Sequence, residues 1–238
     1  MKIRALTTIL FVVYVLSGCS STGNAILQTL PHAYGRNSAV DNARLNPNFR
    51  YLRVTIGGRV VLLALGNVDS GPQGPIEVWY SAEREVLRLQ NGRVVGAVGL
   101  TTEWRDVALP ELPSWAAAAH ANKAFRWTRM RDVMPGYRFA VKDELSLSVV
   151  GAPRRSALQG SDPKLLTWFE ERVEPGAGKG FSAFLGNAAD SLLPLARYAV
   201  EFQGDQATVV YGEQCLAAEL CFTWQRWPVQ AQSAVGQK

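Results

Sequence analysis

The sequence is poor in the residues on which metal centres and acid–base catalysis usually depend. Its 238 residues include two histidines and three cysteines. His32 and His120 stand far apart and in no metal-ligand spacing, so we expect no metal site. The Gly-x-Ser-x-Gly motif of a nucleophile elbow is absent. These absences argue against hydrolytic or metal-dependent chemistry. We expect a protein that is not an enzyme and that carries no cofactor.

Two short strings match parts of catalytic motifs, but neither has the context that such a motif requires. Residues 176–180, Gly-Ala-Gly-Lys-Gly, lack the first glycine and the final Ser or Thr of a phosphate-binding loop. Residues 161–164, Ser-Asp-Pro-Lys, have no companion Ser-Asp-Asn or Lys-Thr-Gly of the penicillin-recognising enzymes. Glu170 and Glu171 are adjacent, so on a strand they point to opposite faces and cannot act as a glycosidase pair.

Long apolar runs are also missing, since none reaches the roughly 20 residues of a membrane-spanning helix. The apolar run over residues 5–16 follows a basic start, which predicts a signal peptide over residues 1–18. Residues 16–19, Leu-Ser-Gly-Cys, have the order of a bacterial lipobox. We therefore expect cleavage before Cys19 and acylation of its thiol, including palmitate. The alternative is an ordinary secreted protein that has a cysteine at this place.

The residues after the lipobox favour one location. Ser20 stands where an aspartate commonly retains lipoproteins in the inner membrane, so we expect the outer membrane and its periplasmic face. Residues 19–40 are expected to form the lipidated N-terminus and a tether. Removal of two basic residues with the signal lowers the formal net charge from +5 to about +3. This weak excess suits anionic lipid head groups or an acidic glycan and is too small to indicate nucleic acid.

The two remaining cysteines are Cys215 and Cys221. In an oxidising periplasm, two cysteines left over after acylation are expected to pair, and we predict a disulfide between them. Two buried free thiols are the next alternative. Metal binding comes last, because no histidine stands nearby in sequence.

From residue 51 onward, short alternating segments separated by Gly, Pro and Asn predict β-strands. The predicted strands are 51–56, 59–65, 76–80, 85–90, 93–98, 125–133, 137–141, 145–150, 166–173, 199–202, 207–211 and 221–227. Gly57-Gly58 and Asn91-Gly92 each join two such segments, which indicates hairpins. Asn-Gly predicts a type I′ turn, because both central residues of that turn need positive φ.

Helical patterns are few. An alanine-rich stretch over residues 114–123 predicts a helix with Ser114 as its N-cap. Residues 187–197 predict a second helix, which Pro194 limits. Many short strands and few helices predict a mainly β, antiparallel barrel or sandwich-like single domain with one or two short helices, over residues 41–228. Residues 229–238 are expected to form a flexible tail.

Aromatic residues offer the clearest candidates for binding. The seven tryptophans are Trp79, Trp104, Trp115, Trp127, Trp168, Trp224 and Trp227. Several stand next to arginines in the sequence. Indole faces stack on the apolar faces of sugars, and guanidinium groups bind hydroxyl or acidic substituents. The alternative is that these side chains fill a β core.

Three further stretches are distinctive: residues 45–54, LNPNFRYLRV; residues 77–81, EVWYS; and residues 89–100, which contain LQNGRVV and VGL. In this order they resemble the GfcB/YjbF lipoprotein family, which is associated with group 4 capsule and related exopolysaccharide operons. The resemblance is best between residues 40 and 107. It implies an antiparallel β-barrel-like domain that supports exopolysaccharide assembly or export and has no established enzymatic activity.

The same resemblance suggests where contacts lie. Trp79 and Arg93 match the most distinctive motifs of the family. The alternative, which we favour, is that Asn91-Gly92 fixes the strand register and that Trp79 fills the core. Together with Trp104 and Trp127, they are our candidate residues for contact with a glycan or a partner protein. The C-terminal part departs from the family pattern. An insert begins near Phe184, where an aromatic-rich strand is expected, so no functional site of the C-terminal strands can be carried over.

These observations leave two main hypotheses about function. The first is a non-enzymatic outer-membrane lipoprotein that supports capsule or exopolysaccharide assembly by binding glycan or partner proteins. The second is a carrier of lipid or lipoprotein that holds acyl chains as LolB-like proteins do. A carrier needs a large apolar cavity, whereas a binding module has a packed interior. A third hypothesis, a glycan hydrolase, needs two carboxylates that face each other across a cleft.

Overall fold

The computed structural model describes residues 40–175 and 192–229. The predicted signal peptide, Cys19, nearly all of the tether and all but the first residue of the predicted tail lie outside these residues. Within them, no helix is long and apolar enough to cross a membrane.

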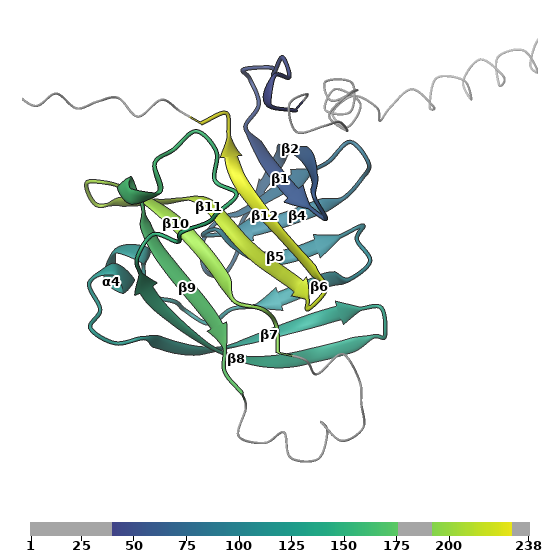
Figure 1. Ribbon diagram of the computed structural model, residues 1–238. Coiled ribbons are helices and arrows are strands. Elements are labelled where there is room, and N and C mark those ends of the chain that lie inside the picture. The colour runs from purple at the N-terminus through teal and green to yellow at the C-terminus, as the bar shows by residue number, and fades with distance from the viewer. Residues whose placement is uncertain (1–39, 176–191, 230–238) are drawn as a thin grey trace, which may run out of the picture.

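In the described residues, twelve antiparallel strands form one sheet that closes on itself as a barrel (Figure 1). The strands are β1 (Tyr51–Ile56), β2 (Arg59–Asp69), β3 (Ile76–Tyr80), β4 (Val86–Gln90), β5 (Arg93–Val98), β6 (Glu103–Ala108), β7 (Phe125–Met134), β8 (Arg138–Val150), β9 (Thr167–Val173), β10 (Ala196–Gln203), β11 (Gln206–Ala217) and β12 (Leu220–Trp227). Each strand pairs with its neighbours in sequence, and β12 pairs with β1. The predicted mainly β, antiparallel barrel is confirmed.

This up-and-down order places alternate connections at opposite ends of the barrel. The helix end carries α4 (Trp115–Ala119) and the β2–β3, β4–β5, β8–β9 and β10–β11 connections. The hairpin end carries the β1–β2, β3–β4, β5–β6, β7–β8 and β11–β12 turns.

The predicted hairpin turns are present where the glycines indicated them. Gly57 and Gly58 join β1 to β2 with φ of 55° and 76°. Asn91 and Gly92 join β4 to β5 with φ of 50° and 80°, which confirms the type I′ turn. Gly92 is also restricted by space, because a Cβ there would lie 2.6 Å from the side chain of Val209.

The structure differs from the predicted elements in three places. The predicted strands 137–141 and 145–150 are one strand, β8. The strand β6 was not predicted, because a register shift between Trp104 and Asp106 breaks its alternation. A second helix over 187–197 is wrong for its described part, since residues 192–195 are not helical and β10 begins at Ala196.

The one predicted helix that is present is shorter than expected. It spans Trp115–Ala119, where the sequence indicated residues 114–123. Ser114 is its N-cap as predicted, and its hydroxyl accepts a hydrogen bond from the amide of Ala117 at 3.1 Å.

The predicted disulfide is also present. Cys215 and Cys221 are bonded, and they face each other across the β11–β12 pair. The bond therefore lies at the hairpin end and joins two adjacent strands.

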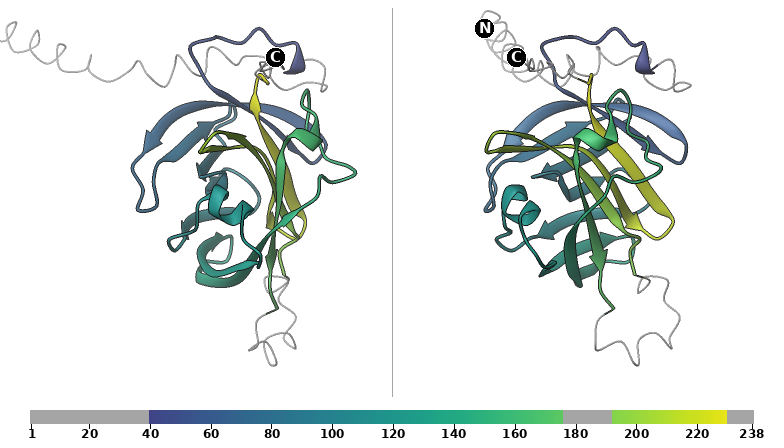
Figure 2. Two further views of the ribbon diagram at one scale, coloured as in Figure 1. Left: turned by 90° about the vertical axis from the view of Figure 1, so that its left-hand side faces the viewer. Right: turned by 60° about the vertical axis from the view of Figure 1, so that its left-hand side comes forward.

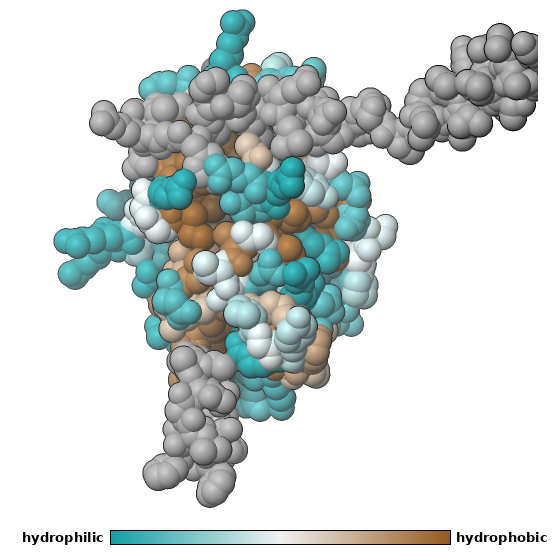
Figure 3. All heavy atoms as spheres, turned by 90° about the vertical axis from the view of Figure 1, so that its right-hand side faces the viewer, coloured by the Kyte–Doolittle hydropathy of each residue, from teal (hydrophilic) through white to brown (hydrophobic). Residues whose placement is uncertain are grey.

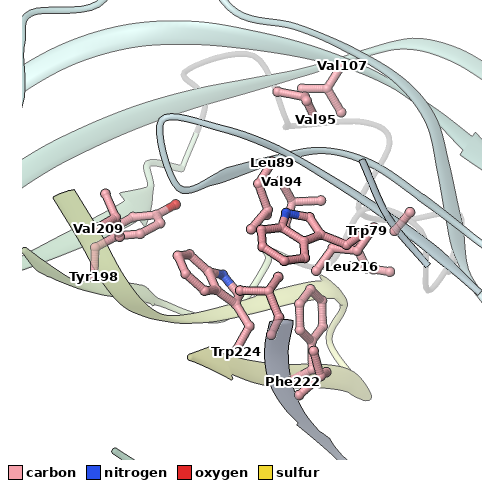
Figure 4. Close-up of a cluster of buried hydrophobic side chains, with 14 of the residues drawn as sticks. Trp79, Leu89, Val94, Val95, Val107, Tyr198, Val209, Leu216, Phe222 and Trp224 are labelled. Carbon is pink, nitrogen blue, oxygen red and sulfur yellow. The ribbon is translucent and has the colours of Figure 1, made fainter. Parts of the chain in front are cut away.

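Large aromatic side chains fill the interior. Trp79 on β3 and Trp224 on β12 are fully buried among Leu89, Leu216 and other apolar residues (Figure 4). Gly212 makes room for one of them, because a Cβ there would lie 2.5 Å from the indole nitrogen of Trp224. The interior is thus a packed core for most of its length.

Two segments cover the outside of the wall. The residues before β1 run over the outside of the barrel beside β1 and β2 (Figure 2). Their side chains at Val40, Leu45 and Phe49 pack against outward side chains of these two strands. The β8–β9 connection contains the short 3-10 helix η1 (Pro163–Leu165) and covers Trp168 and Tyr211. Its amide at Ala157 donates a hydrogen bond to the hydroxyl of Tyr211 at 3.0 Å.

Candidate functional site

A groove of about 840 Å³ lies at the helix end, and we call it the outer groove. Its walls come from the residues before β1, the start of β3, the β10–β11 hairpin and the end of β12. Ser161 and Leu166 of the β8–β9 connection close it on one side. The groove thus unites segments from both halves of the sequence. Its volume falls in the 300–1,000 Å³ range of typical small-molecule sites.

An ion pair stands in the wall of the outer groove. Arg226 donates two hydrogen bonds to the carboxylate of Glu77, at 3.2 and 3.0 Å, in a fork arrangement. The Nε of Arg226 donates to the carbonyl of Val209 at 2.9 Å, and Arg50 lies 3.6 Å from Glu77. With Glu201, the groove holds two positive and two negative side chains, so its lining is close to neutral.

Aromatic faces line the same groove. Phe49 and Tyr51 form an edge-to-face pair with ring centroids 6.5 Å apart. Trp227 is half-buried, and the guanidinium of Arg53 lies 5.8 Å from its ring. Trp79 contributes a fully buried part of the lining. Half-exposed aromatic faces beside polar groups are the chemistry that binds sugar rings.

A second constellation lies inside the barrel, and we call it the inner cluster. It consists of Arg93, Arg129, Arg131, Asp143 and Glu171, each of them buried. Arg129 and Arg131 both donate to Asp143, at 2.8 and 2.7 Å. Arg93 donates to Glu171 at 3.1 Å, and Arg129 lies 3.7 Å from the same carboxylate. Three guanidinium groups and two carboxylates leave the inner cluster with one excess positive charge.

Aromatic rings cover the arginines of the inner cluster. The guanidinium of Arg93 lies 4.1 Å from the ring of Trp115 and 5.4 Å from that of Trp127. The guanidinium of Arg129 lies 4.6 Å from the ring of Trp104. Cation–π contacts of this kind gain strength when they are shielded from water. The indole nitrogen of Trp104 donates to the carbonyl of Leu216 at 3.0 Å, which joins the cluster to β11.

The electrostatics of the inner cluster favour fixed charges over proton transfer. Burial raises the pKa of Asp143, but the hydrogen bond and charge of Arg131 and the charge of Arg129 outweigh it, and the net pKa is lowered. Tyr198 lies beside the cluster, with its ring 5.5 Å from the guanidinium of Arg93. Burial raises the pKa of Tyr198, and the charge of Glu171 raises it further. A general acid or base at neutral pH needs a pKa near 7, and both groups move away from that value.

A third hollow, the mouth cavity, opens at the hairpin end. Its volume is about 190 Å³, and its lining is mostly apolar, with Val54, Leu63, Leu87 and Phe222 among its residues. Figure 3 faces this end of the barrel, where hydrophobic surface is visible between polar patches. The volume is below the range of typical ligand sites.

Comparison with known proteins assigns the family. The sequence model of the family described as group 4 capsule polysaccharide lipoprotein gfcB, YjbF matches residues 43–181, more than half of the chain. The chain belongs to this family. No curated protein matches it. The crystal structure of the hypothetical lipoprotein YmcC from Escherichia coli K12 has a TM-score of 0.57 at 15% identity, over 91% of this chain and 100% of that one. This likeness shows the fold.

The stretches that carry the family resemblance contribute to several parts of the structure. Residues of the stretches 45–54 and 77–81 line the outer groove. The stretch 89–100 places Arg93 in the inner cluster. All three stretches also reach the mouth cavity, through Val54, Ser81, Ala97 and Leu100. Of these two open sites, the outer groove is the larger.

The four candidate binding residues predicted from the sequence are divided between the inner cluster and the outer groove. Arg93, Trp104 and Trp127 come together at the inner cluster, whereas Trp79 lies apart from them beside the outer groove. Trp79 and Trp104 are almost fully buried. Their roles in ligand contact stay predictions.

Sequence reasoning missed the carboxylates of the inner cluster. Glu171 was set aside because it is adjacent to Glu170, and the two do point to opposite sides: Glu170 pairs with Arg197 on the outer wall. No pattern in the sequence indicated a role for Asp143. The alternation of β7, in which Arg129 and Arg131 share a face with buried Val133, could have indicated inward-facing charges.

Proposed function

We propose that this chain is a non-enzymatic, outer-membrane lipoprotein that supports capsule polysaccharide assembly or export by binding glycan in the outer groove. The observation that carries the proposal is the groove itself. It has the volume of a ligand site, a nearly neutral polar lining and the half-exposed faces of Phe49 and Trp227. Two of the stretches that resemble the capsule family build its walls.

The carboxylates of the groove support binding over turnover. A glycosidase needs one carboxylate to donate a proton and a second to attack or to activate water. Glu77 and Glu201 both line the groove, but Glu77 is held by two hydrogen bonds from Arg226 and lies next to Arg50. A carboxylate held in this way serves to orient the arginines, which then bind hydroxyl groups of a sugar.

The alternative of a lipid or lipoprotein carrier finds less support in the barrel interior. Trp79 and Trp224 fill the space that an acyl chain would need. The apolar mouth cavity, at about 190 Å³, is smaller than typical ligand sites. The outer groove is larger but has a mixed polar lining that does not suit an acyl chain.

The proposal is tested by titrating the acylated protein, held in nanodiscs, with oligosaccharides released from the capsule of its own bacterium. Trp227→Ala is expected to weaken binding about tenfold, because one stacking face is lost. Tyr137→Ala is the matched control, since Tyr137 is 76% exposed on the distant β7–β8 hairpin. Equal affinity of wild type and Trp227→Ala would refute the groove as the binding site.

The membrane anchor is tested separately. In cells labelled with palmitate, Cys19→Ser is expected to accumulate as an unprocessed precursor without label, because only a thiol takes the thioether-linked lipid. Normal labelling of this variant would contradict the anchor, while leaving the outer groove untouched.

A further inference from the structure

A second open site lies on the outer wall of the barrel, and we call it the basic pocket. Its volume is about 520 Å³, and its lining includes Arg154, Arg155, Glu170 and Arg197. Arg154 and Arg155 stand where the chain leaves β8, and the other two face outward from β9 and β10. The basic pocket shares no lining residue with the outer groove.

One arginine of the basic pocket is held firmly in place. The Nε of Arg197 donates to Glu170 at 3.1 Å, and its Nη1 donates to Glu213 at 3.3 Å. Glu170 also accepts a hydrogen bond from Arg172 at 2.6 Å. These outward-facing side chains alternate in charge across β9, β10 and β11. Their hydrogen bonds fix the position of the Arg197 guanidinium in the basic pocket.

The other two arginines have no such partners. Arg154 and Arg155 are exposed, and neither forms a hydrogen bond or ion pair with any residue in the described part of the chain. Most of the described arginines outside the pocket are paired, as Arg129 is with Asp143 and Arg88 with Asp69. Three guanidinium groups against one carboxylate give the lining of the basic pocket an excess of two positive charges.

We infer that the basic pocket binds the carboxylate or phosphate groups of an acidic polysaccharide. The inference rests on the proposed glycan-binding function and assigns the acidic substituents to a different surface from the outer groove. A guanidinium group can form two parallel hydrogen bonds with either a carboxylate or a phosphate. Arg154 and Arg155, which are unpaired, can therefore bind one anionic substituent together with the fixed Arg197. The outer groove, whose charges balance, then takes neutral sugar units.

The choice of a glycan substituent over a lipid head group follows from the proposed glycan-binding function. The basic pocket is an open depression between the β8–β9 connection and the strands β9 and β10, and its excess of positive charge complements an anionic side group on a polymer. The anion can be a uronate carboxylate or a sugar phosphate, and the probes below separate the two.

The test uses the acylated protein in nanodiscs of phosphatidylcholine. The probes are polygalacturonate, phosphomannan and uncharged dextran, with glycerol phosphate as a stand-in for a lipid head group. We expect wild type to bind polygalacturonate or phosphomannan at least tenfold more tightly than Arg154→Glu/Arg155→Glu. Added salt should weaken this binding, because the contact is charged and exposed.

Lys123→Glu/Arg126→Glu is the matched control. It makes the same change in net charge at two exposed residues elsewhere on the surface and is expected to alter the affinity less than twofold. Equal losses in the two double variants would overturn the inference, because net charge alone would then explain binding. Binding of glycerol phosphate with no binding of either acidic polymer would overturn it in favour of a lipid head group.

A conservative variant adds a second check. Arg154→Lys/Arg155→Lys keeps the charge but loses the fork, so an intermediate loss of affinity is expected. Failure of the inference is also distinguishable from failure of the proposed function. Trp227→Ala reports on neutral oligosaccharide in the outer groove, and Arg154→Glu/Arg155→Glu leaves that binding unchanged.

Discussion

The inner cluster and the outer groove use the same residue types in different surroundings. In the inner cluster, Asp143 and its two arginines are each less than 10% exposed, and aromatic rings shield them from water. In the outer groove, Arg226 is 28% exposed and Arg50 is 58% exposed, while the aromatic faces are partly open. The charges of the inner cluster are therefore buried inside the barrel, whereas those of the outer groove are partly exposed to solvent.

This difference in burial gives the two regions different roles: the inner cluster contributes to stability, and the outer groove is available for ligand binding. A buried charge that loses its partner is costly, because neither water nor a counter-ion replaces the lost interaction. An exposed pair is screened by solvent and contributes little to stability. The inner cluster is therefore expected to hold β7, β8 and β9 in register, and the outer groove is free to vary its contacts with a ligand.

The largest effect is expected from Asp143→Ala. It leaves Arg129 and Arg131 buried without their carboxylate, so the free energy of unfolding should fall by about 3–5 kcal/mol. Denaturant titration measures the change. Asp69→Ala, which removes an exposed partner of Arg88, should cost less than about 1 kcal/mol. Similar losses for both variants would show that burial does not set how much a charge pair contributes to stability.

A smaller effect is expected from Arg50→Ala in the outer groove. Because Arg50 is exposed, the free energy of unfolding should change by less than about 0.5 kcal/mol. The affinity for capsule oligosaccharide should nevertheless fall several-fold, which the nanodisc titration measures. A large loss of stability with unchanged affinity would show that Arg50 belongs to the framework and not to the binding surface.

The smallest effect is expected from pH. The pKa of Asp143 is lowered in the folded protein from its ordinary value of 3.8. Its carboxylate therefore stabilises the fold above the unfolded-state pKa, and this contribution is lost as the pH falls through the lower folded-state pKa. Wild type should lose stability more steeply below pH 3.8 than Asp143→Asn does. Parallel curves for the two proteins would mean that Asp143 carries no acid-linked stability.

Local patterns in the sequence predicted most of the strands but failed where charges enter the barrel. The segment around Lys142, Asp143 and Glu144 reads as a break between two strands, and yet β8 continues through it. It continues because Arg129 and Arg131 on the neighbouring strand neutralise the inward carboxylate. That compensation is a contact between strands, and no local pattern contains it.

The candidate site was predicted only in part, for a related reason. Arg93 and Trp79 were both noted, but one lies in the inner cluster and the other beside the outer groove. The pair of Glu77 and Arg226 was not expected, because 149 residues separate its members. A tryptophan pattern indicates aromatic chemistry without showing which rings remain open to solvent.

The sequence by itself determined the turns at Gly57-Gly58 and Asn91-Gly92, the alternating strands and the pairing of Cys215 with Cys221. These features depend on backbone conformation and on residues that are close along the chain. The tertiary structure alone decided that Arg93 meets Glu171 across 78 residues and that the end of β12 joins β1 beside the outer groove. Closure of the barrel brings these distant residues into contact, and their depth in the closed structure sets which charges are buried and which remain available to a ligand.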